Sequence, residues 1–240
     1  MTTELLSAGN DSKTPKGEKI GVYTAIQYLL PANAGGKYNL CAYASNGCLE
    51  ACLNTAGRGK FNSVQKARLN RTNLFNTDRE TFFTKLIFEI ARHRRKALKL
   101  GLQPAIRLNG TADIKWEAQH IPNTDRLTIF DLFPDVHFYD YTAYPYHKRP
   151  TESLPKNYHL TMSRKENNEE DCLEALRNGR NVAAVFSTKK GEALPKTYKG
   201  YEVIDGDLHD VRYKDKQGVV VGLRAKGDAR KDQSGFVIQI

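Results

Sequence analysis

The chain has 240 residues, and 37 Lys and Arg residues outnumber 27 Asp and Glu residues, which gives a formal net charge of +10. No apolar stretch reaches the roughly 18 residues of a membrane span, and the N-terminus lacks the pattern of a secretory signal, so we expect neither a membrane protein nor a secreted one. A chain of this length buries a core without disulfide bonds, and its positive charge favours anionic partners such as nucleic acid or phosphorylated small molecules. We expect the protein in the cytoplasm.

The first segments are a polar tail, a strand and a loop rich in cysteine. Residues 1–19 have no sustained periodicity and predict a disordered N-terminal tail, which leaves residues 20–240 as a single domain. Residues 20–30, IGVYTAIQYLL, predict a strand that ends at a turn rich in Pro, Asn and Gly. The loop that follows holds three of the four cysteines, Cys41, Cys48 and Cys52.

Two helices are predicted after the cysteines. Residues 61–75 can form a helix, and a second, amphipathic helix begins at a capping box formed by Thr77 and Glu80. The span from Lys60 to Lys99 holds eleven Lys and Arg residues against three acids. Such a run is either a solvated helix face or a surface that binds the phosphates of nucleic acid.

Beyond residue 101, short apolar runs that predict strands alternate with loops and helical segments. The runs are PAIRLNGTAD, VHFYDYT, NYHLTMSRKEN, NVAAVFST, YEVIDGDLHD and GVVVGLRAKG. Helical segments are predicted at 113–119, 124–133 and 168–178. With the strand at 20–30 there are about seven strands, close to the eight of a closed barrel, so we predict an α/β protein with a partial β/α TIM-like barrel. A doubly wound open sheet is the alternative.

Both architectures gather reactive side chains at the carboxyl ends of their strands. Many polar residues lie where the predicted strands end. Loops are exposed to solvent, so any single polar residue there needs no functional explanation. Carboxylates and an imidazole can transfer protons, and arginine can hold an anion, so the candidate catalytic residues are Asp140, Arg164, Asp207 and His209. A turn that contains glycine lets the backbone approach a ligand, and basic side chains at strand ends can hold an anion. The candidate cofactor- and substrate-binding residues are therefore Asn109, Thr111, Asp113, Ser163, Arg224 and Lys226.

The three clustered cysteines indicate a metal centre, because thiols stay reduced in the cytoplasm. Zinc would need a fourth ligand, and Cys172 lies in a predicted helix where a small buried thiol is expected. A cubane iron–sulfur cluster tolerates three thiolates and leaves one iron open to a ligand. We therefore expect a 4Fe-4S cluster held by Cys41, Cys48 and Cys52, ahead of zinc and of structural thiols.

The position of this loop, just after the first predicted barrel strand, resembles the cluster loop of the radical SAM superfamily. That resemblance implies S-adenosylmethionine as a further cofactor, chelated by the open iron. The spacing differs, because this chain has CX6CX3C where the superfamily has CX3CX2C. A cluster that acts as a Lewis acid or carries electrons fits the same ligands.

A closer resemblance is carried by six motifs: ASNGCLEACLNTAGRGKFNSVQKAR, PAIRLNGTADIKWE, FYDYT, NYHLTMSRKEN, DGDLHD and GVVVGLRAKG. Together they resemble the bacteriophage and plasmid family called gene product eighty-eight, from about residue 38 to the C-terminus. The resemblance implies a mobile-element origin, the cytoplasm of an infected bacterium, and a site built from the motif residues named above. It identifies relatives without naming a reaction.

These observations lead to two expectations about function, one an enzyme and the other a nucleic-acid-binding protein. The first is an iron–sulfur enzyme, of radical SAM, lyase or oxidoreductase type, that acts on a small or nucleotide-linked anionic substrate at the open iron. The alternative is a basic phage protein that binds nucleic acid through residues 60–99 and uses its cysteines for a structural metal.

Overall fold

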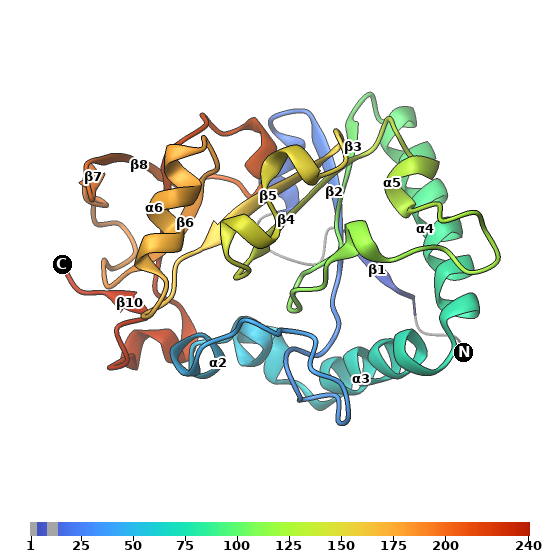
Figure 1. Ribbon diagram of the computed structural model, residues 1–240, viewed down its shortest axis with the longest axis horizontal. Coiled ribbons are helices and arrows are strands. Elements are labelled where there is room, and N and C mark those ends of the chain that lie inside the picture. Colours follow the sequence, from blue (N-terminus) through green and yellow to red (C-terminus); the bar gives the residue numbers. More distant parts are fainter. Residues whose placement is uncertain (1–3, 9–13) are drawn as a thin grey trace.

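The computed structural model describes residues 4–8 and 14–240, and Figure 1 shows an open sheet flanked by helices. The strands are β1 (Leu6–Ala8), β2 (Val22–Gln27), β3 (Gln103–Arg107), β4 (His137–Thr142), β5 (Tyr158–Ser163), β6 (Val182–Phe186), β7 (Thr197–Tyr198), β8 (Tyr201–Asp205), β9 (Val220–Arg224) and β10 (Val237–Ile238). The α-helices are α1 (Thr14–Glu18), α2 (Asn46–Glu50), α3 (Asn62–Thr77), α4 (Arg79–Lys99), α5 (Ile129–Leu132) and α6 (Glu169–Arg177). The 3₁₀ helices are η1 (Leu53–Thr55), η2 (Gly57–Lys60), η3 (Trp116–Ala118), η4 (Tyr146–Lys148), η5 (Thr151–Ser153), η6 (Arg212–Lys214) and η7 (Gly227–Lys231).

The strands form one sheet in the order β1-β2-β3-β4-β5-β6-β9-β8-β7, and β10 pairs with β6 off this path. The pairs from β2 through β6 to β9 and β8 are parallel, whereas β1 and β7 are antiparallel to their neighbours at the two ends. All seven strands predicted from the sequence are present. The predicted barrel is not, because the strand order stays open and β9 lies between β6 and β8 instead of continuing a closed ring. The fold is mixed α/β with an open ten-stranded sheet.

One face of the sheet holds the apolar core and is covered by α4 and α6. Ile106 and Phe138 are register partners on β3 and β4, so they lie on the same face, and both pack against Phe83 and other apolar residues of α4. Farther along the sheet, Met162 of β5 packs with the buried residues of α6. In Figure 1 these two helices lie over different ends of the sheet. Hydrophobic burial on this face fixes the strands whose carboxyl ends carry the candidate site.

The opposite face is covered by the connection from β8 to β9. Val211 from this connection packs against Val22, Ala105 and Tyr139, which alternate with the core residues of their strands. Arg107, on the same face, donates to Asp210 of the connection over 2.6 Å. In a closed barrel this face would line the interior. Here a crossing loop fills it instead, which is a second reason why the sheet stays open.

Part of the predicted disordered tail belongs to the sheet. Leu6–Ala8 pairs with β2, and Leu5 is fully buried. The buried carboxylate of Glu89 on α4 accepts the backbone N–H groups of Leu5 and Leu6 at 2.8–3.0 Å. Residues 1–3 and 9–13 of the predicted tail lie outside the described residues.

The predicted helices differ from the observed ones mainly at their ends. Helix α4 is capped by Asp78, whose Oδ1 accepts the backbone N–H of Thr81 at 3.0 Å, and not by Thr77. Thr77 is the last residue of α3 and donates its hydroxyl to the carbonyl of Asn73. The segment 113–119 contains only the 3₁₀ helix η3, and 124–133 contains only the four-residue α5, which ends before Pro134 as proline geometry requires.

Among the described residues, no helix combines the length and the apolar character needed to cross a bilayer.

Candidate metal centre

The three cysteines lie on the segment that leaves β2 and crosses the carboxyl edge of the sheet. Cys48 is on α2, whose N-cap Ser45 accepts the Cys48 N–H with its hydroxyl over 3.3 Å. Cys52 caps η1, and its Sγ accepts the N–H of Asn54 at 3.5 Å. Ala51 packs against Ala225 at the end of β9, so the segment reaches across the edge. Figure 1 shows it beside α3.

The environment of the three thiols keeps them protonated. Burial raises the pKa of Cys41 to about 12 and that of Cys48 to about 11, and it also raises the pKa of Cys52. The other thiols and Asp113 add to the rise at Cys41 and Cys48, which shows that the sulfurs lie near one another. Burial therefore disfavours the thiolate form of all three cysteines at neutral pH.

In this structure the three sulfurs are farther apart than the ligands of one zinc ion would be. In the described structure they do not all lie within 4.8 Å of one another. A tetrahedral zinc with Zn–S bonds of about 2.3 Å holds its sulfurs about 3.8 Å apart. An iron–sulfur cluster attaches each thiolate to a different iron and so separates them more widely. Cys172 is not a fourth ligand in this arrangement, because it lies on the buried face of α6 and its Sγ donates to Asn168 Oδ1 at 3.5 Å.

The turn after β3 brings two of the predicted binding residues to the cysteines. The carbonyl of Thr111 lies 3.9 Å from Cys41 Sγ, and the Thr111 hydroxyl donates to the carbonyl of Leu29. The N–H of Asp113 donates to the carbonyl of Leu40, next to Cys41 in the chain, at 2.8 Å. Burial raises the pKa of Asp113, although Arg149 opposes the rise. These contacts place the turn directly beside the cysteine segment.

Asn109 shapes this turn and has little capacity left for a ligand. Its side-chain oxygen accepts the Ile114 N–H and the Trp116 indole N–H, both at 3.0 Å, and its amide nitrogen donates to the Ile114 carbonyl at 2.9 Å. Its backbone N–H donates to Asp140 at 2.9 Å. The side chain predicted to bind a cofactor is therefore committed to holding the turn.

Asp140 lies behind the turn and is fully buried. Its two carboxylate oxygens accept the Asn109 N–H and, at 3.0 Å, the hydroxyl of Tyr158. Burial raises the pKa of Asp140 to about 7, while Arg107 and the hydrogen bonds oppose the rise. This carboxyl group therefore titrates near neutral pH, as an acid–base group does, but it contacts protein groups only.

Arg149, which the sequence analysis missed, anchors the site from the loop after β4. Its guanidinium forms two hydrogen bonds of 2.8 and 2.7 Å with Glu117, one of 3.0 Å with Thr142 and one of 3.3 Å with Asp113. The side chain is 0% exposed. It fixes the loops after β3 and β4 to each other. The motif HKRP gives no signal for this role, because the partners are distant in sequence.

Two residues directly after β5 hold the segment that carries Cys48. Glu166 accepts the Ser45 hydroxyl at 2.7 Å and the Gly47 N–H at 3.0 Å. Partial burial alone would raise the pKa of Glu166, but these hydrogen bonds lower it, so the group is a carboxylate at neutral pH. Lys165 donates to the Tyr43 carbonyl at 2.7 Å and lowers the pKa of Cys48 against the effect of burial. A side chain at Gly47 would collide with Glu166 and Phe236.

The two other candidate residues at the end of β5, Ser163 and Arg164, form hydrogen bonds that hold neighbouring segments of the chain in place. Ser163 ends β5, and its carbonyl accepts the side-chain N–H of Asn168 at 3.0 Å. Arg164 donates to the carbonyls of Gly235 and Phe236 and so holds the chain just before β10. The structure thus gives Arg164 an internal partner rather than an open position above the cysteines.

The candidates after β8 and β9 form a separate network. Arg224 binds Asp205 at 3.0 Å and Asp207 at 3.4 Å, and Lys226 binds Asp207 at 2.7 Å. His209 Nδ1 accepts the Val211 N–H at 3.2 Å, which places the ring in the connection to β9. These groups lie at the same edge of the sheet, but their charges pair with one another.

An aromatic and basic cluster borders the cysteine segment. The rings of Tyr43 and Tyr144 lie 4.4 Å apart at a tilt of 49°. The ammonium group of Lys148 donates to the Tyr43 hydroxyl at 2.6 Å, and that of Lys115 lies 5.7 Å from the centre of the Tyr144 ring. This rim cluster, composed of Tyr43, Tyr144, Lys115 and Lys148, offers rings and positive charges beside Cys41 and Cys48.

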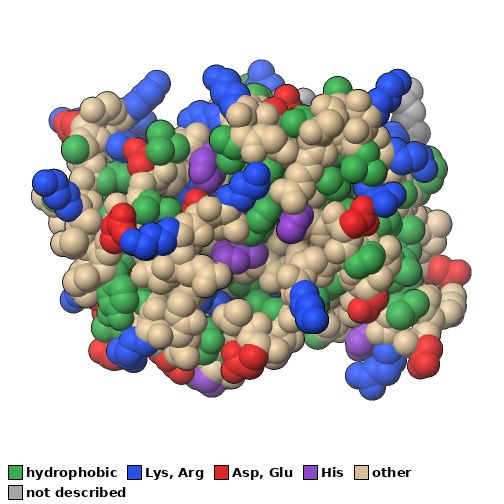
Figure 2. Space-filling model, turned by 90° about the horizontal axis from the view of Figure 1, so that it is seen from above, with side chains coloured by type: hydrophobic (Ala, Val, Ile, Leu, Met, Phe, Trp, Pro, Cys, Tyr) green, Lys and Arg blue, Asp and Glu red, His purple; other side chains and the backbone are tan. Residues whose placement is uncertain are grey.

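The basic segment 60–99 forms η2, α3 and α4, and several of its charges have partners inside the protein. Arg68 is buried and donates to Asn54. Arg92 pairs with Glu4, and Arg94 pairs with Asp135 over 2.6 Å. Figure 2 views the side opposite α3, and on that side basic side chains are scattered among acidic and apolar ones. Nucleic-acid binding by this segment stays a prediction.

Comparison with known proteins identifies the family of the chain but no relative of known activity. No curated protein and no solved structure matches it. A family model, described as gene product 88, matches residues 4–240, which include the cysteine segment and every strand end described above. The match covers nearly the whole chain and agrees with the resemblance carried by the six sequence motifs. The chain therefore belongs to the gene product 88 family.

Proposed function

We propose that the protein is a phage-encoded iron–sulfur enzyme that holds a 4Fe-4S cluster with Cys41, Cys48 and Cys52. The observation that carries the proposal is the gathering of three partly buried, protonated thiols on one segment at the carboxyl edge of a parallel sheet. Active sites of α/β proteins form at this edge. A cluster held by three thiolates leaves one iron with an open position for a substrate or cofactor.

The surroundings of the thiols support a metal-bound state. Burial destabilises free thiolates, so it gives three metal-free thiols no benefit. Around a bound metal, the same burial would keep water away from the metal–sulfur bonds. Arg68 lowers the pKa of Cys52 and Lys165 lowers that of Cys48, each against the larger effect of burial. Both cations offset the negative charge that three thiolates bring.

The rim cluster supports a small or nucleotide-linked anionic substrate. Tyr43 and Tyr144 offer ring faces for a base, and the ammonium groups of Lys115 and Lys148 offer charge to a phosphate or carboxylate. Asp113 is the carboxyl group closest to Cys41 among the candidate residues. S-adenosylmethionine is the more specific proposal for the ligand of the open iron, supported by the position of the cysteine segment after the first parallel strand, β2.

Asp140, whose pKa burial raises to about 7, is a proton-holding candidate in this proposal; because it is fully buried and bonded to Asn109 and Tyr158, it would act through these neighbours and not on the substrate directly. Asp207, His209, Arg224 and Lys226 remain candidates by their place at the same edge. Their mutual ion pairs must open before they can hold a ligand. A cytoplasmic site in an infected bacterium fits this proposal, because the thiols must stay reduced.

Anaerobic reconstitution with iron and sulfide tests the proposal. We expect about four irons per chain and the broad visible absorption of a cubane cluster. Cys41→Ala, Cys48→Ala and Cys52→Ala should each lower the iron content sharply. Cys172→Ala is the matched control, because this thiol lies on the buried face of α6, and it should retain the full iron content.

Two results would contradict the proposal. One is a colourless protein that retains one zinc per chain after the same treatment. The other is an iron content that falls equally in all four cysteine variants. If zinc is found together with salt-dependent nucleic-acid binding that is lost when Arg92, Arg94 and Arg95 are neutralised, the alternative function is favoured.

A further inference from the structure

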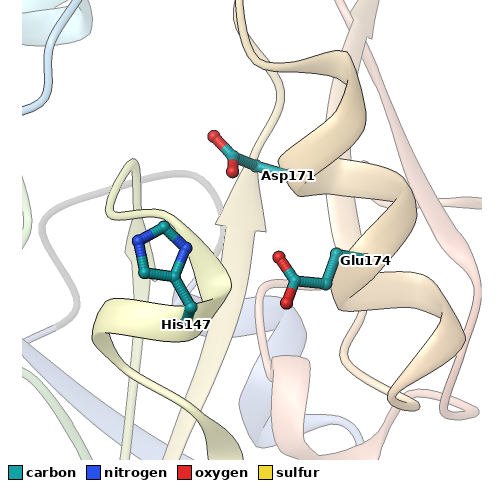
Figure 3. A group of neighbouring side chains, drawn as sticks. All are labelled: His147, Asp171 and Glu174. Atoms are coloured by element: carbon teal, nitrogen blue, oxygen red, sulfur yellow. The ribbon is translucent and has the colours of Figure 1, made fainter.

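A second group of metal-ligand side chains lies on the surface between η4 and α6. His147 from η4 and Asp171 and Glu174 from α6 each offer one ligand atom, and these atoms all lie within 4.8 Å of one another. Figure 3 shows the imidazole facing the two carboxylates across the gap between the elements. Asp171 and Glu174 are three residues apart on the helix, so they project from the same face.

The two elements that carry these ligands are fixed to each other by buried packing. Tyr146, next to His147, is buried against Cys172 and Ala175 of α6. The guanidinium of Arg180 lies 4.7 Å from the centre of the Tyr146 ring. A site between η4 and α6 therefore rests on a rigid scaffold, although its ligands are on the surface.

The charges of this group have no other partners in the described part of the chain. The side chains of His147, Asp171 and Glu174 form neither a hydrogen bond nor an ion pair with any described residue. Two carboxylates on adjacent turns of a helix repel each other, and a cation between them relieves the repulsion. Lys148 lies close in sequence but donates to Tyr43 instead. No described basic side chain forms an ion pair with either carboxylate, so both are available to a cation.

We propose that His147, Asp171 and Glu174 bind one divalent first-row transition-metal ion, with water in its remaining positions. One imidazole and two carboxylates form a donor set for Mn²⁺, Fe²⁺ or Zn²⁺. The bound ion ties η4 to α6 and steadies the loop that carries Lys148 to the rim cluster. This site is independent of the cysteines, and the proposal does not rest on the proposed function.

Binding of Mn²⁺ to the full chain, followed by electron paramagnetic resonance, tests this site. Mn²⁺ is the probe because it prefers oxygen and imidazole ligands and competes poorly for thiols. We expect one bound Mn²⁺ per chain, displaced by a lower concentration of Zn²⁺, which binds such donors more tightly. His147→Ala and Asp171→Asn should each weaken Mn²⁺ binding at least tenfold.

Two matched variants make the result specific. Glu170→Gln removes an exposed carboxylate from the same helix turn, and Cys48→Ala removes a ligand of the other proposed centre. Both should bind Mn²⁺ like the unaltered protein. The proposal is overturned if no Mn²⁺ binds at millimolar concentration. It is also overturned if the bound Mn²⁺ is as tight in His147→Ala and Asp171→Asn, checked by circular dichroism to be folded, as in Glu170→Gln.

Discussion

The carboxyl edge of the sheet has two regions that are both rich in polar and charged side chains. They differ in whether those side chains form ion pairs with one another. After β8 and β9, Asp205, Asp207, Arg224 and Lys226 neutralise one another in a network whose members are 14–49% exposed. After β2 to β5, acids and a buried arginine form a framework around three thiols. In the first region the charged side chains pair with one another, whereas in the second burial raises the pKa values of three thiols.

The comparison shows that charge density at strand ends does not by itself identify a site. What distinguishes the cysteine region is the combination of burial with groups whose charged form the protein does not stabilise. The two regions should therefore respond differently when one member of an ion pair is removed.

Loss of Arg149 should have the largest effect on the cysteine region. Arg149→Met leaves Glu117 and Asp113 without their cation, so the free energy of unfolding should fall by about 3–5 kcal/mol. Urea denaturation measures the change. Arg94→Met is the control, because its pair with Asp135 is 39% and 48% exposed, and it should cost less than about 1 kcal/mol. Equal effects of the two substitutions would remove Arg149 from its role as an anchor.

Asp140 should give the protein a distinctive pH dependence. Its pKa is about 7 in the folded state and about 3.9 in the unfolded state, so the folded state holds the extra proton between these values. The contribution of Asp140 to stability is therefore greatest below about pH 4 and declines as the pH rises to about 7, by on the order of 2–4 kcal/mol.

Asp140→Asn should flatten this decline, because the amide does not ionise; its oxygen can accept the Asn109 N–H and its nitrogen can donate to the Tyr158 hydroxyl oxygen. Urea denaturation between pH 4 and pH 8 measures it, with the exposed Asp135→Asn as the control. An unchanged slope in Asp140→Asn would show that another group causes the decline.

A smaller effect is expected in the network after β8 and β9. Arg224→Gln leaves Asp205 and Asp207 partly accessible to water and Lys226 still paired, so the free energy of unfolding should fall by only about 1–2 kcal/mol. The iron content after reconstitution should not change. If iron is lost with Arg224, the two regions act as one site and the contrast between them fails.

The smallest effect is expected at Glu166. Glu166→Gln weakens the hydrogen bonds to Ser45 and Gly47, which should cost about 1 kcal/mol and loosen the start of α2. Alkylation of Cys48 in the metal-free protein should become faster while that of Cys172 stays constant. The reverse order would show that Glu166 does not hold the Cys48 segment.

The sequence was most informative about single elements and least informative about their partners. Strand runs such as VHFYDYT were found because apolar, β-branched and aromatic residues mark buried strands directly. The tail was misread at Leu6–Ala8, whose strand depends on a distant carboxylate, Glu89. Within the candidate site, the cysteines and Asp113 were found from local pattern, whereas Arg149 and Glu117 were missed because their pairing spans 32 residues.

By itself, the sequence determined the seven main strands, the long amphipathic helix and the clustering of three thiols after the first of these strands. All of these follow from periodicity and spacing, which are local properties of the chain. Only the tertiary structure decided that the sheet stays open, that β9 lies between β6 and β8, and that Asp207 pairs with Lys226 and Arg224. Those outcomes depend on which strand ends and loops meet in space. Ion pairing and thiol pKa values depend on burial and on neighbours that are distant in the sequence, so a local sequence pattern does not reveal them.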